Sequence, residues 1–314
     1  MREGFCIVTI VILSSKKEPL MALAGALTTV AMGACGSTVF RHVALTPLQP
    51  ASNVVHDNEE TMDADRPHVG TGTHLVRPGQ IQFELGGQFN SFGSRRTYGS
   101  PVLGRIGITD SIEARFGFDG LIGQRDDQGS AQSIGNAQLA AKVRVRGERE
   151  APWLSIMPSM TLGLASADKG LGSGENDVSL TLLAGGQVAG RTHAEANYGV
   201  AAVGGGHGRG YFLQHLMTGA VVYNLTSRLS TYGEIASWSK QEINGGAVRF
   251  ADFGVIHSVH SRLIVDAGGA VGLSEAAPRY IIFAGLSFLL ERESSHRPPR
   301  VLPTLRREQM ATRR

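Results

Sequence analysis

Short segments in which apolar residues alternate with polar or small residues follow one another between residues 80 and 290. The clearest segment spans residues 136–146, where one parity is apolar and the other consists mostly of basic and amide side chains. Because successive side chains of a strand point to opposite faces, a period of two indicates a strand with one apolar and one charged face. The pattern recurs in about twelve segments and predicts an all-β protein.

The connections between these segments alternate in length. Tight turns are predicted at residues 109–110, 190–191, 226–227 and 257–260. Longer, glycine-rich and polar connections are predicted at residues 90–99, 124–133, 167–176, 204–210 and 240–246. Short turns on one rim and long loops on the other are typical of bacterial outer-membrane barrels. An even number of strands then places both chain ends on the short-turn, periplasmic side.

A soluble β-sandwich or a water-soluble barrel would alternate in the same way, with the apolar parity inside. The alternation alone leaves the facing open. Two observations favour a membrane barrel: segments of roughly ten residues suit a tilted crossing, and no apolar-rich helix exists to cover either face. We therefore predict that residues 79–290 form a closed antiparallel transmembrane β-barrel of about 12 strands.

Composition also favours strands over helices. The chain has 41 glycines, 12 prolines and 6% aromatic residues, and its mean hydropathy is −0.04, as expected when lipid-facing and lumen-facing residues alternate. Its net charge of +3 is concentrated in residues 291–314, which hold seven arginines and three glutamates. Because the rest of the chain is not basic, we expect no nucleic-acid partner. Both cysteines, Cys6 and Cys35, precede the predicted barrel, which therefore has no internal disulfide.

Residues 1–35 resemble an export signal, since two lysines precede an apolar, small-residue run at residues 20–34. The run leads into the sequence MGAC, which resembles a bacterial lipobox and makes Cys35 a lipidation candidate. The alternative is an ordinary cleavage site with an incidental cysteine. Residues 36–78 lack periodicity and are predicted to be a flexible periplasmic tether, and residues 291–314 a basic disordered tail.

If the charged parity faces the lumen, charged side chains from neighbouring strands meet inside the barrel. The predicted lumen residues are Glu84, Arg105, Glu113, Arg115, Asp119, Lys142, Arg144, Arg146, Glu234 and Asp266. Most come from the first four strands, near the periplasmic turns, and rings of charged side chains can set the selectivity of a pore. The alternative is that opposite charges pair across strands and plug or rigidify the barrel.

Candidate catalytic and metal-binding residues are few. An outer-membrane lipid hydrolase would need a serine with a histidine, and His193, His215 and His257 are the candidates. The glycine-rich run at residues 204–210 lacks the Lys-Ser/Thr ending of a phosphate loop, and the histidines lack metal-ligand spacing. We expect no enzymatic activity, no cofactor and no metal site.

Several stretches together resemble a known family. They are DRPHV at 65–69, RPGQIQFE at 77–84, LGRIGITDSIEARFGFD at 103–119, YGE at 232–234, and LIVD at 263–266 with GLS at 272–274. In order and spacing they are similar to the bacterial outer-membrane transporter family of the "MetA-pathway of phenol degradation" type. The resemblance implies an outer-membrane barrel that passes small molecules and is loosely associated with aromatic compounds. The tail after Leu290 departs from the family, whose chains end close to the last strand.

The expected function is an outer-membrane channel or transporter for small solutes, with aromatic or hydrophobic compounds as candidates. A non-conducting structural or surface-interaction barrel is the alternative, and a lipid hydrolase is a lesser one. The expected partners are outer-membrane lipids and the barrel assembly machinery.

Overall fold

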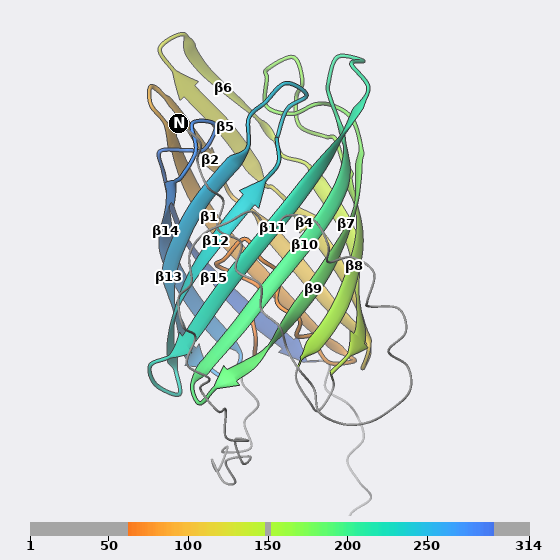
Figure 1. Cartoon of the computed structure of the whole chain (residues 1–314), viewed down its shortest axis with the longest axis vertical. Helices are drawn as coiled ribbons and strands as arrows, with labels where there is room; N and C mark the ends of the chain where they lie inside the picture. The colour runs from red at the N-terminus through yellow and green to blue at the C-terminus, as the bar shows by residue number, and fades with distance from the viewer. Residues whose placement is uncertain (1–61, 148–151, 292–314) are drawn as a thin grey trace, which may run out of the picture. The chain divides into compact units, whose positions relative to one another are not determined.

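The computed structural model describes residues 62–147 and 152–291, which form fifteen β-strands (Figure 1). No helix in these two ranges is long and apolar enough to cross a membrane. The strands are β1 (Gln80–Phe92), β2 (Arg95–Gly99), β3 (Val102–Thr109), β4 (Ile112–Phe118), β5 (Leu121–Asp126), β6 (Gly129–Ile134), β7 (Ala137–Arg146), β8 (Trp153–Leu162), β9 (Asp177–Ala189), β10 (Thr192–Gly204), β11 (Tyr211–Asn224), β12 (Leu229–Trp238), β13 (Val248–His260), β14 (Leu263–Gly272) and β15 (Tyr280–Glu291).

Twelve long antiparallel strands close into a barrel, because β15 pairs with β1 along its whole length. The fifteen labelled strands reduce to twelve because β2–β3, β4–β5 and β6–β7 are successive parts of three long strands. At the second interruption Gly120 has a φ of +69°, a left-handed conformation that favours glycine. The predicted closed barrel of about 12 strands is confirmed.

The two rims differ as predicted. Tight turns join β3 to β4, β9 to β10 and β11 to β12 at one rim, and the β5–β6 hairpin and the loops before β9, β11, β13 and β15 extend from the other (Figure 1). The predicted turn at residues 257–260 is wrong. A register irregularity between Ser258 and His260 lets β13 continue, and the turn is at Ser261 and Arg262.

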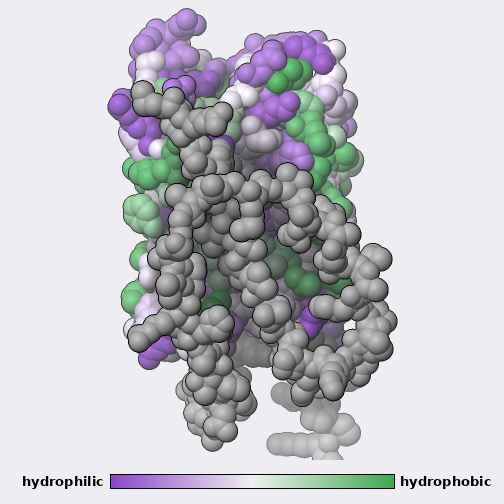
Figure 2. All heavy atoms as spheres, viewed as in Figure 1, coloured by the Kyte–Doolittle hydropathy of each residue, from purple (hydrophilic) through white to green (hydrophobic). Residues whose placement is uncertain are grey.

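The wall is apolar outside and polar inside. Large apolar side chains such as Leu182 and Phe253 are 51% and 62% exposed, whereas Glu84 and Lys142 are fully buried inside the barrel. Figure 2 shows hydrophobic residues at mid-height on both sides of the grey atoms and hydrophilic residues at the loop rim. A soluble barrel has the opposite arrangement, so the facing supports the membrane interpretation.

Residues 62–78, here called the lumen segment, lie inside the barrel rather than in a tether. Both ends of the segment are at the short-turn rim: the amide of Met62 donates to Ser261, and the amide of Gly79 donates to Gly107 (3.1 Å each). The segment has almost no regular secondary structure, and it forms the orange trace in the lower lumen of Figure 1. The tether prediction depends on the lack of a periodic pattern of apolar residues, and this lack does not distinguish a free chain from one that is bound by side chains.

The predicted export signal, the lipidation candidate Cys35, the remainder of the tether and the tail after Glu291 lie outside the described residues.

Candidate functional site

The lumen segment places one carboxylate, Asp65, among three buried cations. Asp65 contacts Arg115, and its Oδ2 atom lies 3.6 Å from Arg105 Nη1 and 3.3 Å from Lys142 Nζ. The three cations, here called the cationic wall, come from β3, β4 and β7, which are adjacent in the barrel. Arg105 and Lys142 are 1% and 0% exposed, so Asp65 neutralises charge that water barely reaches.

The cationic wall also pairs with carboxylates of the barrel. Arg105 donates two hydrogen bonds to Glu113, both at 3.0 Å, and one to Glu84 at 3.1 Å. Arg115 Nη1 donates to Glu113 Oε1 at 2.8 Å. Two-point contacts between arginine and carboxylate are strong and directional. Opposite charges therefore pair across strands, and this pairing fixes the geometry of the wall.

Arg66, the next residue of the lumen segment, points away from the cationic wall. Its Nη2 atom lies 3.2 Å from Asp266 Oδ1 on β14 and donates to the carbonyl of Ala284 at 3.2 Å. The guanidinium rests against Gly86 and Gly285, which are paired across β1 and β15. A Cβ atom on either glycine would occupy the place of the guanidinium, so the two glycines form a cradle for it.

Carboxylates gather on the opposite side of the lumen. The acidic wall consists of Glu195 on β10, Glu234 on β12, Asp252 on β13 and Asp266 on β14. In the closed order of strands, these lie across the barrel from β3, β4 and β7. Glu234 and Asp252 are direct partners in the β12–β13 register, where like charges repel. His68 approaches this wall, 3.9 Å from Glu195, so the lumen segment also supplies a cation here.

The barrel binds the main chain of the lumen segment as well as its charges. Glu84 accepts hydrogen bonds from the amides of residues 65–66 (3.2 and 3.0 Å), and Glu234 accepts from the amides of residues 69–70 (2.7 and 2.8 Å). Asn197 accepts a hydrogen bond from the amide of Thr71 and donates one to the carbonyl of Thr71. Each of these side chains thus replaces a backbone partner that a strand would otherwise supply.

The cations bind carbonyl oxygens of the same segment. Lys142 Nζ donates to the carbonyls of Gly72 and His74 (2.8 and 3.0 Å), and Arg105 donates to that of His74 (2.9 Å). Buried backbone groups without partners are costly. By satisfying them, the lumen holds an irregular segment inside the barrel.

The two walls shift the pKa values of two titratable groups of the lumen segment. Burial by itself would raise the pKa of Asp65, but the cationic wall outweighs burial and holds that pKa well below its usual range. Burial by itself would lower the pKa of His68, but the carboxylates of Glu195 and Glu234 outweigh it and the pKa is raised. The charged forms of both residues are therefore favoured while the segment is in place.

Most of the predicted lumen residues lie together around the lumen segment. They are Glu84, Arg105, Glu113, Arg115, Lys142, Glu234 and Asp266. Three others do not join them. Arg144 donates to the carbonyl of Asp110 at the short-turn rim, and Arg146 is exposed at the end of β7. Asp119 lies between β4 and β5 and accepts a hydrogen bond from the amide of Asn136. Alternation predicts the facing of a side chain but not its height in the barrel.

Sequence reasoning missed several members of the site. Asp65 and Arg66 lie in the segment predicted as a tether. Glu195 and Asn197 alternate with two alanines, which is a signal of an inward-facing polar parity on β10. Asp252 lies in a segment of weak alternation, where its facing cannot be derived from the sequence.

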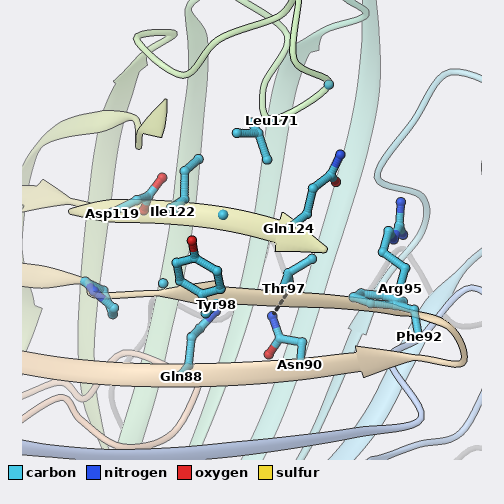
Figure 3. Close-up of a pocket in the computed structure, with 14 residues that line it drawn as sticks. Gln88, Asn90, Phe92, Arg95, Thr97, Tyr98, Asp119, Ile122, Gln124 and Leu171 are labelled. Carbon is cyan, nitrogen blue, oxygen red and sulfur yellow. Dashed lines mark hydrogen bonds between the residues drawn. The ribbon is translucent and has the colours of Figure 1, made fainter. Parts of the chain in front are cut away.

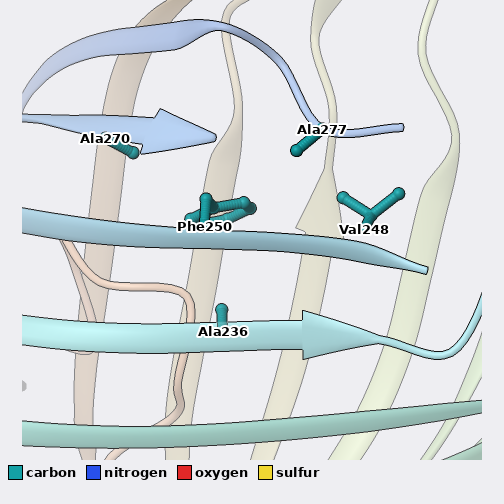
Figure 4. Close-up of a cluster of buried hydrophobic side chains, with 5 residues drawn as sticks. All are labelled: Ala236, Val248, Phe250, Ala270 and Ala277. Atoms are coloured by element: carbon teal, nitrogen blue, oxygen red, sulfur yellow. The ribbon is translucent and has the colours of Figure 1, made fainter. Parts of the chain in front are cut away.

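An apolar patch lies inside the barrel above the acidic wall, toward the long-loop rim. It consists of Ala236, Val248, Phe250, Ala270 and Ala277, with Val69, Trp238 and Ile281 packed against it (Figure 4). The rings of Trp238 and Phe250 are 5.5 Å apart. One side of the upper lumen is therefore apolar and aromatic.

A polar pocket of about 430 Å³ lies near the long-loop rim. Gln88 and Asn90 of β1, Thr97 of β2 and Gln124 of β5 line it, with Leu171 of a loop (Figure 3). Asn90 donates to the hydroxyl of Thr97 at 3.0 Å. The loop end of the barrel thus combines amide groups with an apolar side chain.

Two of the three histidines considered for hydrolysis have other side-chain partners. The ring of His193 bonds to Glu195 at 3.1 Å, and that of His215 bonds to the hydroxyl of Tyr198 at 2.9 Å. Within the described ranges, no cluster of histidine, cysteine and carboxylate residues has the geometry to hold a metal ion.

Comparisons with known proteins agree with the fold. An outer-membrane channel from Pseudomonas putida F1 superimposes with a TM-score of 0.57 and 12% identity, over 71% of this chain and 100% of that one. The NanC porin (TM-score 0.47, 9% identity, 66% of this chain and 98% of that one) and the KdgM porin in complex with disordered oligogalacturonate (0.42, 12%, 67% and 98%) are more distant. None of the curated proteins matches the chain.

The family model described as "MetA-pathway of phenol degradation" matches residues 64–290. This range begins inside the lumen segment and ends with the last strand of the barrel. The chain therefore belongs to this family of outer-membrane barrels.

Proposed function

We propose that this protein is a channel that passes small solutes across the bacterial outer membrane. The observation that carries the proposal is the closed barrel with a polar, charged interior and an apolar exterior. Such an interior provides an aqueous path, and its charges can select among solutes. The lumen segment occupies the lower part of this path, so conduction requires the segment to move.

The two rims support one direction of the barrel in the membrane. Short turns face the periplasm in outer-membrane barrels, and both β1 and β15 have their free ends at the short-turn rim. In this arrangement the N- and C-terminal regions are periplasmic, the lumen segment enters from the periplasm, and solutes from outside first meet the loop rim.

Aromatic or hydrophobic solutes are the candidates that the family resemblance implies. The apolar patch around Phe250 and Trp238 supports this class, because the partly buried ring of Trp238, packed against the buried Phe250, is an aromatic group on one side of the upper lumen. An uptake assay with liposomes that compares benzoate with acetate would test it, since an aromatic preference requires faster entry of benzoate.

A reversible lock of the lumen segment tests the channel itself. A Cβ atom on Gly70 would lie 2.8 Å from Thr218 Oγ1 on β11, so cysteines at these two positions are placed to form a disulfide. We expect the double variant Gly70→Cys/Thr218→Cys to be closed in planar bilayers when oxidised and to conduct after reduction. Cys6 and Cys35 would be replaced by serine to prevent mispairing.

The single variant Gly70→Cys is the matched control, because it changes the segment without a partner for a disulfide. It should conduct equally under oxidising and reducing conditions. The absence of conductance in the reduced double variant and in the single variant would overturn the channel and favour a non-conducting barrel.

A further inference from the structure

We propose that the lower lumen is a binding site for a peptide in which an acidic residue is directly followed by a basic one. Asp65 and Arg66 of the chain's own lumen segment occupy this site in the structure. The proposal deepens the proposed function and rests on it, since it names a class of solute for the same lumen.

The barrel recognises the main chain of the segment. Both oxygens of Glu84 accept hydrogen bonds from successive amides, and Glu84 is fully buried. Arg105 and Gln82 donate to the carbonyl of Asp63, two residues earlier in the segment (3.2 and 2.9 Å). These contacts are to main-chain amides and carbonyls, which do not depend on the particular side chains of the segment.

The two sides of the lumen distinguish the order of the charges. The side chains of Asp65 and Arg66 have partners on different strands of the barrel. Asp65 accordingly meets the cationic wall, whereas Arg66 meets Asp266 and the cradle of Gly86 and Gly285. With its main chain running in the same direction, a peptide with the reverse order would place a cation against cations and an anion against an anion.

The acidic wall can accommodate a further basic group. Asp252 is 3% exposed and is the register partner of Glu234, and its side chain interacts with those of Glu234 and Tyr232. A basic group on a bound peptide would relieve the repulsion between the two neighbouring carboxylates.

The chain's own segment competes with any added peptide. A tethered ligand has an effective concentration in the millimolar range, so a free peptide binds measurably only when the segment is loosened. The double variant Asp65→Asn/Arg66→Gln removes both charged contacts from the segment and leaves every barrel side chain unchanged. Gly70→Ala is a second way to loosen the segment, because its Cβ atom would lie 2.8 Å from Glu234 Oε1, across the lumen from the cationic wall.

The test measures the binding of fluorescently labelled, end-blocked tetrapeptides to the full chain in detergent micelles, by anisotropy. The peptide Ala-Asp-Arg-Pro is compared with the reversed Ala-Arg-Asp-Pro and the neutral Ala-Asn-Gln-Pro. We expect the double variant to bind Ala-Asp-Arg-Pro at least tenfold more tightly than the wild type does. It should also prefer this peptide at least tenfold over the reversed one, and Asp266→Asn added to the double variant should remove the preference.

Equal binding of the three peptides, or no binding to either loosened variant, would overturn the proposal. Circular dichroism verifies that each variant retains its strands. Because the assay needs no transport, it is independent of the proposed channel. Binding that depends on the order of the charges, without conductance, would support the peptide site and contradict the channel. Conductance without such binding would support the channel and contradict the peptide site.

Discussion

At the scale of single residues, two neighbouring glycines of β1 differ in what a methyl group would meet. A Cβ atom on Gly86 would collide with the guanidinium of Arg66, whereas a Cβ atom on Gly87 has no neighbour within 4 Å. We expect Gly86→Ala to displace Arg66 from Asp266 and to weaken the binding of the lumen segment by about 1.5–3 kcal/mol, the range for a charged hydrogen bond. Gly87→Ala should leave the binding of the lumen segment unchanged.

Hydrogen exchange of the backbone amides of residues 65–70, followed by mass spectrometry, would detect the difference between the two glycine variants. Equal exchange in the two variants would show that the cradle does not hold Arg66. Their adjacent positions make Gly87→Ala a close control for any general effect of a methyl group on β1.

The raised pKa of His68 predicts a pH dependence of the same segment. Its pKa is near 6.5 when the segment is free and higher in the lumen, so the stabilisation is fully present below about pH 6.5 and is lost as the pH rises through the raised value. We expect amide exchange in the segment, corrected for the intrinsic rate, to increase above neutral pH. His68→Gln should remove this increase, whereas His257→Gln, which changes an exposed residue of β13, should retain it.

At the scale of elements, the lumen segment should be released as a unit, because its contacts share the same few barrel side chains. Asp65→Asn leaves the cationic wall short of one carboxylate, and breaking a buried ion pair costs about 3 kcal/mol or more. We therefore expect the amides of residues 65–76 to exchange together and about 100-fold faster than in the wild type. Asp63→Asn is the control, since that side chain is 57% exposed. Faster exchange confined to residues 65–66 would contradict release as a unit.

The elements also show how far the sequence could be interpreted. A period of two predicts the strands and, once a membrane is assumed, the inward facing of Glu113 and Lys142. It predicts neither the interruption of a long strand at Gly120 nor the place of the lumen segment. Several contacts of that segment join residues far apart in the sequence, such as Thr71 with Asn197 (126 positions) and Arg66 with Asp266 (200 positions), and no local pattern encodes these pairs.

At the scale of the whole barrel, the charged residues have a consistent arrangement. Cations and carboxylates face each other across the lumen, and the segment that lies between them offers an anion to one side and cations to the other. The barrel concentrates its polar groups inside because the outer face must meet lipid. The stability of the barrel in a membrane should therefore depend on the apolar character of that outer face.

A charge placed on the outer face should accordingly destabilise the barrel in proportion to its depth. Leu182 lies at the centre of β9 and Val188 near its end at the short-turn rim, and both side chains point outward, 51% and 62% exposed. We expect Leu182→Arg to lower the free energy of unfolding in lipid vesicles by about 2–4 kcal/mol and Val188→Arg by about 0–1 kcal/mol. Urea unfolding of the vesicle-inserted protein measures both. Equal losses would mean that β9 does not cross the hydrocarbon layer at the height inferred from its rims.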